Sequence, residues 1–229
     1  ARLGIGHLIL VDPDVVEVKN LNRILNSTLR DAEGRRAKVT VLSERIQNIG
    51  IGTKVSTIQG NLINANTVKQ VANADVVFGC MDTHEGRLLL NRLSAVYCLP
   101  YIDVGVRIKC EEDGAITEVT GAVHYLVPDG SSLLSRGVIS AETARSEGIK
   151  RTNPELYRDL VERDKYIQGI RENAPAVISL NGQIASTGVN EFLARLTGYR
   201  FSGNKLFYRQ MYSLAAGLWI HEEDGKPCP

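Results

Sequence analysis

The chain has 229 residues, 43% of them hydrophobic and 23% charged, which is ordinary for a globular protein with a full core. The formal net charge of +1 gives no general attraction to nucleic acid or an anionic membrane, and no run of residues has the length and apolarity of a transmembrane helix. The four cysteines (Cys80, Cys98, Cys110 and Cys228) form no C-x-x-C pair. We therefore expect a reducing, cytoplasmic location and no disulfide framework.

The first predicted element is a buried strand at His7–Val11, and a polar stretch follows it. Asp12 stands at the carboxyl end of this strand, and Asn20, Arg23 and Lys38 come after it. A carboxylate at a strand end can accept hydrogen bonds from ribose hydroxyls, and cations can hold phosphates. The stretch therefore suits a nucleotide site. A strand with a solvated, mixed-charge loop after it remains equally open at this point.

Strands and helices then alternate along the chain. The apolar spacing predicts a helix over about 36–48, a strand at 54–59, a helix at 64–72, a central parallel strand at 75–80, a helix at about 85–97 and a strand at 101–106. The helix at 85–97 is expected to have Leu89, Leu93 and Val96 or Tyr97 on its inner face. This alternation predicts an α/β fold with a Rossmann-like, doubly wound, mostly parallel sheet.

From Val106 onward the pattern changes. Residues 107–109 and 116–127 read as a hairpin around the turn at 111–114, so antiparallel strands should extend the sheet. Residues 128–173 are polar, with one predicted helix at about 154–165, and form a crossover loop. A long helix at 177–196 with Leu180, Ile184 and Phe192 inward and a last strand at 205–211 complete the prediction.

Several motifs together resemble the ThiF/MoeB/HesA family. The pattern D-x-D-x-V-x-x-x-N-L-x-R runs from Asp12 to Arg23, and a G-x-x-x-K pattern follows at Gly34 and Lys38. The apolar strand that ends in Asp82, and an R-x-x-x-N helix, match the family further on. The remaining parts of the resemblance are Arg87 with Asn91, Tyr101 to Gly105, and Ala174 to Val177 followed by Asn190 and Glu191.

The resemblance implies ATP-dependent adenylation of the C-terminal carboxylate of a ubiquitin-like (ThiS/MoaD-type) protein, with release of pyrophosphate. In that family pattern Asp12 binds the ribose of ATP, and Asn20, Arg23 and Lys38 bind its phosphates. Asp82 holds Mg²⁺, and Arg23, Lys38 and Asp82 are the implied catalytic residues. Each also has a structural alternative: Asp12 as a turn residue, the two cations as surface charges, and Asp82 as a helix N-cap.

The resemblance also implies a single adenylation domain over residues 1–229, with 128–173 as its crossover loop. The family's glycine-rich loop and the strand before it are not in this sequence, so a fragment is expected. Ser132 and Ser135 align with the first of two zinc-binding C-x-x-C pairs in relatives, and zinc is therefore not expected. Partners implied by the family are a small ubiquitin-like protein with a C-terminal glycine and a second subunit in a homodimer, whereas no nucleic acid or membrane partner is expected.

A thioester would need a reactive cysteine, and Cys110 is the only modest candidate, because Cys80 and Cys98 are expected to be buried. Two other functions stay open. Asp12 at a strand end also fits an NAD-dependent Rossmann oxidoreductase. The chain could instead be a degenerate, non-catalytic nucleotide-binding module.

Overall fold

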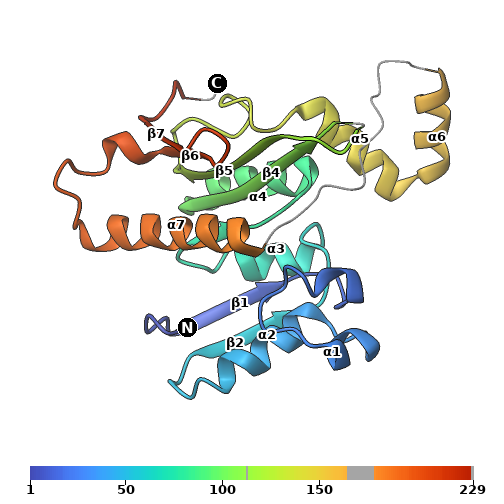
Figure 1. Ribbon diagram of the computed structural model, residues 1–229, viewed down its shortest axis with the longest axis horizontal. Coiled ribbons are helices and arrows are strands. Elements are labelled where there is room, and N and C mark those ends of the chain that lie inside the picture. Colours follow the sequence, from blue (N-terminus) through green and yellow to red (C-terminus); the bar gives the residue numbers. More distant parts are fainter. Residues whose placement is uncertain (112, 164–177, 228–229) are drawn as a thin grey trace. The chain divides into compact units, whose positions relative to one another are not determined.

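The computed structural model describes residues 1–111, 113–163 and 178–227, and the chain divides into two compact units, Ala1–Ala74 and Asp75–Pro229 (Figure 1). The first unit has a two-stranded sheet and the second a five-stranded sheet. Both combine strands with helices, each contains a parallel strand pair, and the second adds antiparallel strands. The predicted α/β class, with parallel strands extended by antiparallel ones, is confirmed.

In the first unit, strand β1 (His7–Val11) pairs in parallel with β2 (Lys54–Ile58), with His7 opposite Lys54. Between them lie a 3₁₀ turn, a short helix and a longer helix, and one more helix follows β2. Helix α2 packs on the two strands. The helical segments are the 3₁₀ turn Val18–Asn20, α1 (Leu29–Glu33), α2 (Lys38–Gln47) and α3 (Ala65–Val71).

Local signals explain why these elements begin and end where predicted. The Asn64 side chain caps α3 by accepting a hydrogen bond from the Asn66 amide at 2.9 Å. Gly50 and Gly52 follow α2 with positive φ angles of 74° and 83°, a conformation that glycine adopts without strain. The apolar spacing of α2 predicts Val39, Leu42 and Ile46 on one inner face, and this was wrong in one respect, because Val41 is buried whereas Leu42 is 41% exposed.

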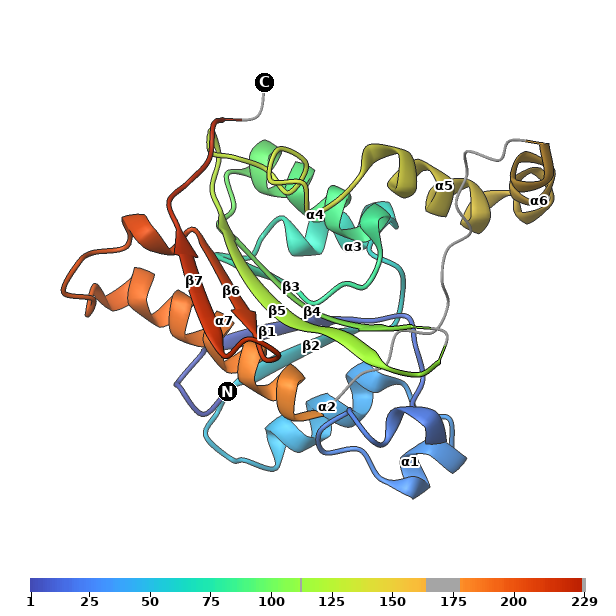
Figure 2. The ribbon, with the colours of Figure 1, turned by 45° about the horizontal axis from the view of Figure 1, so that its top comes forward.

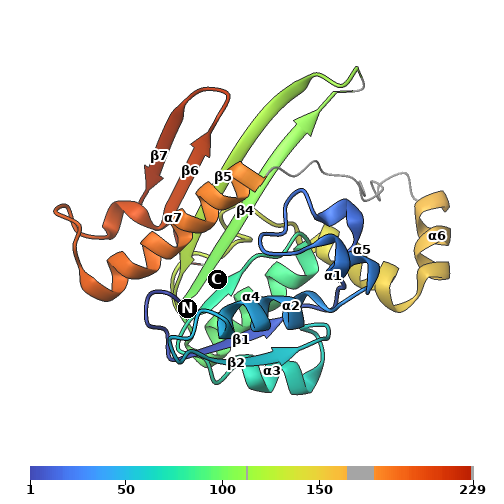
Figure 3. The ribbon, with the colours of Figure 1, turned by 60° about the horizontal axis from the view of Figure 1, so that its bottom comes forward.

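The second unit is organised around one sheet in the order β3-β4-β5-β6-β7. Its first pair is parallel and its other three are antiparallel, so the antiparallel extension is larger than predicted. The predicted hairpin is confirmed as two long strands, β4 and β5, which Figure 3 shows as a ribbon. The strands are β3 (Val77–Gly79), β4 (Tyr101–Cys110), β5 (Ile116–Leu126), β6 (Arg209–Ser213) and β7 (Leu218–Glu222).

Two helices cover the opposite faces of this sheet, α4 (His84–Tyr97) and α7 (Ile178–Thr197), as Figure 2 shows. On the α7 side, Ile102 and Ile184 belong to one buried apolar cluster. Helix α7 lies so close to β5 that a Cβ at Gly121 would be 2.3 Å from the Ile184 side chain. Because successive strand residues point to opposite faces, the neighbours of Ile102 in β4 face α4 instead.

Several predicted elements differ from the structure. The strand at 75–80 is parallel, as predicted, but within the second unit it is an end strand of three residues and not a central one. The predicted inner face of α4 was confirmed at Leu93, which is buried, but it was wrong at Val96 and Tyr97, which are exposed, and it missed the buried Leu90. Leu90 and Leu93 are separated by three residues, so they share one face of the helix.

The described part of the crossover segment, residues 128–163, contains two helices where one was predicted. The expected helix is α6 (Pro154–Arg163), and the additional one is α5 (Ala141–Thr152), which packs on α4. At the other end, the predicted strand at 205–211 is a 3₁₀ turn (Lys205–Phe207) followed by β6, and the hairpin partner β7 was not predicted.

Some sequence features lie outside the described residues. These are the Ala174 to Val177 part of the family resemblance, residues 164–173 of the crossover loop, Glu112 of the hairpin turn, and Cys228. Among the helices that are described, none combines the length and apolarity that crossing a membrane requires.

Candidate functional site

In the first unit, the backbone holds Lys38 at the carboxyl end of β1. The Lys38 amide donates to the Asp14 carbonyl at 3.0 Å, and Val15 forms an isolated antiparallel bridge with Ala37. The Lys38 ammonium lies 2.7 Å from Asp14 Oδ2 and 3.9 Å from Asp12 Oδ2. The structure thus brings together two of the predicted site residues, Asp12 and Lys38, and adds the carboxylate of Asp14.

Lys38 is also the first residue of α2. A positive charge is unfavourable there, because the unpaired amides of a helix N-terminus already carry partial positive charge. The same amides favour anions such as phosphates. The Lys38 ammonium and the first amides of α2 thus lie together at this end of the helix, beside the carboxylates of Asp14 and Asp12.

Asp12 also has the structural role that the sequence left open. Its Oδ1 accepts a hydrogen bond from the Asp14 amide at 2.8 Å, which closes a turn around Pro13. The side chain is 37% exposed, and Oδ2 is the oxygen that faces Lys38. Turn formation by one oxygen leaves the carboxylate accessible, so this role and a role in ribose binding are compatible.

Asn20 and Arg23 belong to the turn after β1. Asn20 is buried, and its Oδ1 accepts from the Glu17 amide at 3.2 Å. Arg23 is half-buried and donates from Nη1 to the Lys19 carbonyl at 2.9 Å and to Asn22 Oδ1 at 3.3 Å. The described contacts of Arg23 stay within its own turn, so its place beside a phosphate remains a prediction.

Sequence reasoning missed Asp31, a buried carboxylate that joins α1 to α2. It accepts from the Thr28 hydroxyl at 2.6 Å and pairs with Arg36 at 2.8 Å and with Arg45 at 3.5 Å. The Thr28 hydrogen bond is the main cause that lowers the pKa of the Asp31 carboxyl, against the effect of burial. The signal in the sequence was T-x-x-D at 28–31, a capping pattern at the start of α1.

In the second unit, Asp82 lies in the turn between β3 and α4. The structure assigns the helix cap to its neighbour, because the Thr83 hydroxyl accepts from the Gly86 amide at 3.3 Å. Asp82 is exposed, and the described part of the chain offers its carboxylate neither a hydrogen bond nor an ion pair. The alternative that Asp82 is the N-cap of α4 is therefore wrong, and a free carboxylate is chemically suited to Mg²⁺.

The R-x-x-x-N motif on α4 joins this helix to its surroundings. Arg87 Nε donates to the Met81 carbonyl at 3.0 Å and lies 3.4 Å from Asp103 Oδ1 on β4. Asn91 Oδ1 accepts from the Leu133 amide at 3.0 Å. Each residue of the motif thus links α4 to a different neighbouring segment.

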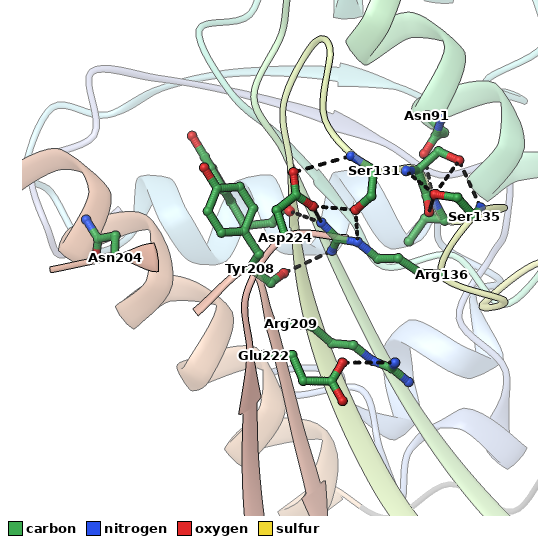
Figure 4. A network of polar contacts seen from close by, with 12 residues as sticks. Asn91, Ser131, Ser135, Arg136, Asn204, Tyr208, Arg209, Glu222 and Asp224 are labelled. Carbon is green, nitrogen blue, oxygen red and sulfur yellow. Dashed lines mark hydrogen bonds and ion pairs between the residues drawn. The ribbon is translucent and has the colours of Figure 1, made fainter. Parts of the chain in front are cut away.

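Ser132 and Ser135, the residues aligned with a zinc-binding pair in relatives, hydrogen-bond to each other. Ser135 Oγ accepts from the Ser132 amide at 2.8 Å, and Ser132 Oγ accepts from the Ser135 amide at 3.1 Å. Beside them, Arg136 pairs with Asp224 at 2.8 Å and donates to Ser131 Oγ at 2.6 Å (Figure 4). Arg136 and Asp224 were not singled out by the sequence. They tie the loop after β5 to the segment after β7.

A row of polar residues crosses the α4 side of the sheet. Asp103, His124 and Arg209 occupy facing positions on β4, β5 and β6. His124 is 2% exposed, and its Nδ1 has no described partner. Burial, together with Arg136, Arg209 and Arg87, lowers the pKa of His124 from 6.5 to about 3, so this ring is neutral at physiological pH.

The cysteine predictions need one correction. Cys80 and Cys98 are exposed, not buried. Cys98 follows the last residue of α4 in a left-handed conformation with φ of 54°. Cys110 is half-buried at the end of β4. Across residues 1–111, 113–163 and 178–227, no three His, Cys, Asp or Glu side chains gather as a metal-binding group would.

Comparison with known proteins identifies the family pattern over almost the whole chain. The ThiF family model matches residues 1–220. The chain is 28% identical over 130 residues to the SAMP-activating enzyme E1 of Haloferax volcanii, covering 57% of this chain and 44% of that protein. It is 30% identical over 102 residues to the sulfur carrier protein ThiS adenylyltransferase of Escherichia coli, covering 44% of this chain and 40% of that protein.

A third relative is the ubiquitin-like modifier-activating enzyme 5 of Drosophila persimilis, 25% identical over 161 residues, with 66% of this chain and 40% of that protein covered. The matches thus span less than half the length of these curated relatives. Among solved structures, E. coli MccB with ATP has a TM-score of 0.67 at 17% identity, covering 98% of this chain and 58% of that one. At this identity the likeness concerns the fold alone.

Proposed function

The chain belongs to the ThiF family, and we propose that it is the adenylation part of an enzyme that activates a small ubiquitin-like protein. The proposed reaction joins the C-terminal carboxylate of that protein to the α-phosphorus of ATP. A carboxylate oxygen forms the new bond to phosphorus, the bond from phosphorus to the bridging oxygen breaks, and pyrophosphate leaves. The product is an acyl-adenylate.

The observation that supports this proposal most directly is the placement of Lys38. Its ammonium stands at the start of α2 and at the carboxyl end of β1, with Asp12 within 3.9 Å. Ligands of α/β sheets bind beyond the carboxyl ends of the strands. Asp12 would accept from the ribose, and Lys38 would bind phosphate in place of the exposed carboxylate of Asp14. Asn20 and Arg23 would add an amide and a second cation to the phosphate site.

In the second unit, Asp82 would hold Mg²⁺, since its exposed carboxylate has no described partner and magnesium sites in proteins use one or two carboxylates with phosphate oxygens. Magnesium supplies charge neutralisation on the phosphate oxygens. Lys38 and Arg23 would stabilise the negative charge that develops on the departing pyrophosphate. Such electrostatic stabilisation contributes to rate, because it is stronger in the transition state than in the ground state.

The relatives that the chain matches support the proposed substrate class. Their names describe activation of a sulfur carrier protein, of SAMP and of a ubiquitin-like modifier. These names support the proposed adenylation of a small ubiquitin-like protein. The C-terminal glycine of that protein and the homodimer come from the family resemblance alone and stay predictions. Family membership also favours adenylyl transfer over the NAD-dependent oxidoreductase that the sequence left open.

The test is ATP–pyrophosphate exchange by the full-length protein with labelled pyrophosphate, MgATP and candidate ubiquitin-like partners. We expect exchange that requires both Mg²⁺ and a partner with an intact C-terminal glycine. The control is the same partner with that glycine removed. ATP binding without exchange for any partner would instead favour the non-catalytic module, and binding of NAD in preference to ATP would overturn the proposal.

A further inference from the structure

The turn that carries Asp82 is fixed from inside the second unit by one side chain. Arg87 Nε donates to the carbonyl of Met81, the residue directly before Asp82, at 3.0 Å. The Arg87 side chain is only 18% exposed, so this hydrogen bond is shielded from water. A charged donor to a carbonyl is a strong hydrogen bond, and it restrains the backbone at the point where the Asp82 carboxylate begins.

Arg87 is itself anchored on strand β4. Its Nε lies 3.4 Å from Asp103 Oδ1, and Asp103 is 1% exposed. The same oxygen of Asp103 accepts from the Tyr101 hydroxyl at 2.7 Å. Gly105 leaves room for the guanidinium, because a Cβ at that position would be 2.3 Å from Arg87 Nη2. The position of Arg87 is thus set by the sheet.

The other side of the turn is fixed by α5. The Ser140 amide donates to His84 Nδ1 at 2.9 Å, and Glu147 accepts from the Glu85 amide at 2.7 Å. Arg151 binds both oxygens of Glu85, at 3.1 and 3.0 Å. The first residues of α4 are therefore held in place as firmly as Met81. Asp82 lies between Met81 and the start of α4, and none of the described contacts involves its carboxylate.

We propose that Arg87 is a positioning residue, which uses Asp103 as its anchor and Met81 as its contact to aim the Asp82 carboxylate at Mg²⁺. The inference rests on the proposed function, because it takes magnesium to bind at Asp82. Mg²⁺ demands near-ideal octahedral geometry, so a small displacement of a ligand weakens binding. Arg87 acts through the backbone and is not itself a metal ligand.

The experiment compares four variants of the full-length protein, and Mn²⁺ serves as a paramagnetic substitute for Mg²⁺. Arg87→Ala removes the contact, Arg87→Lys keeps the charge near Asp103 but loses the fixed geometry at Met81, and Gly105→Ala displaces the guanidinium from β4. Arg92→Ala is the matched control, because Arg92 is an exposed arginine of the same helix. Electron paramagnetic resonance measures Mn²⁺ binding with a non-hydrolysable ATP analogue, and pyrophosphate exchange is measured against Mg²⁺ concentration.

We expect the three variants at Arg87 and Gly105 to weaken Mn²⁺ binding and raise the Mg²⁺ requirement by about 10- to 100-fold, as loss of groups that orient metal ligands typically does. The KM for ATP of these three variants at saturating Mg²⁺ should stay close to the wild-type value. The Arg92→Ala protein should match the wild type in Mn²⁺ binding and in its Mg²⁺ requirement. In the Asp82→Asn background, Arg87→Lys should add no further loss, because the residue that it positions is already neutral.

Two results would overturn the inference. The first is tight Mn²⁺ binding by folded Arg87→Lys and Gly105→Ala proteins. The second is a full additional loss when Arg87→Lys is combined with Asp82→Asn, which would mean that Arg87 acts independently of Asp82. If the wild-type protein neither exchanges pyrophosphate nor binds Mn²⁺ with the ATP analogue, the proposed function itself fails, and that outcome is distinguishable because it does not depend on any variant.

Discussion

Replacing Lys38 by alanine should separate catalysis from stability. The ion pair that Lys38 makes with Asp14 is solvent-accessible, with side-chain exposures of 23% and 63%. Exposed pairs of this kind contribute about 0–1 kcal/mol to stability. Against this, the ammonium at the first position of α2 opposes the helix dipole by about 0.3–1 kcal/mol. The two effects nearly cancel, so Lys38→Ala should change the free energy of unfolding by less than about 1 kcal/mol.

The effect on catalysis should be much larger. Losing one charge-stabilising contact in a transition state costs roughly two to three powers of ten in rate, or about 3–4 kcal/mol. Pyrophosphate exchange and thermal unfolding of Lys38→Ala measure the two effects separately, and Arg23→Ala should lower exchange in the same direction. Lys69→Ala, an exposed lysine of α3, is the control. Near-normal exchange by both Lys38→Ala and Arg23→Ala would refute the phosphate assignment.

Two further predictions follow from the second unit. Asp82→Asn should nearly abolish pyrophosphate exchange without changing the melting temperature. Thr83→Ala should instead lower the free energy of unfolding by about 1 kcal/mol, because Thr83 is the residue that caps α4. Full activity of Asp82→Asn at low Mg²⁺ would contradict the assignment of Asp82 to the metal. His124 stays neutral in the folded chain and is protonated in the unfolded chain, so stability should fall by about 1.4 kcal/mol per pH unit as pH drops from 6.5 to about 3. His124→Asn should remove that part of the pH dependence in urea unfolding, and parallel curves for the two proteins would show that His124 is not its source.

The elements that the sequence predicted correctly are those with local signals. The strand at His7–Val11 and the helix after Asn64 begin and end where their apolar runs and capping residues indicate. Helix α5 was missed because its sequence has no continuous apolar face. Its stability depends on contacts that no local pattern reveals, such as the pairing of Arg151 with Glu85 on α4. The N-cap at Ser140 is a local signal, and tertiary contacts add to it in stabilising this helix.

The candidate site divides in a similar way. The family motif gave the positions of Lys38 and Asp82, but it could not give their partners. Asp82 and Thr83 are both favourable N-cap residues, Asp somewhat more so, yet the backbone of the turn places Thr83 at the cap. Likewise, the contact of Arg87 with Asp103 depends on the pairing of β3 with β4 and on the way in which α4 packs on them. Long-range contacts of this kind are not encoded in spacing along the chain.

Charged side chains with a structural role differ from candidate functional ones in whether the partner of the ion pair is buried or exposed. Arg36 binds the buried carboxylate of Asp31, and breaking that pair would leave a buried charge uncompensated. Lys38 pairs with Asp14, whose carboxylate is exposed. A phosphate can replace this carboxylate at little cost, because water then solvates it. Asp82 is the complementary case, an exposed carboxylate without a described partner. A ligand that binds Lys38 or Asp82 therefore breaks no buried interaction, which is the condition that a site for exchangeable ATP and Mg²⁺ must meet.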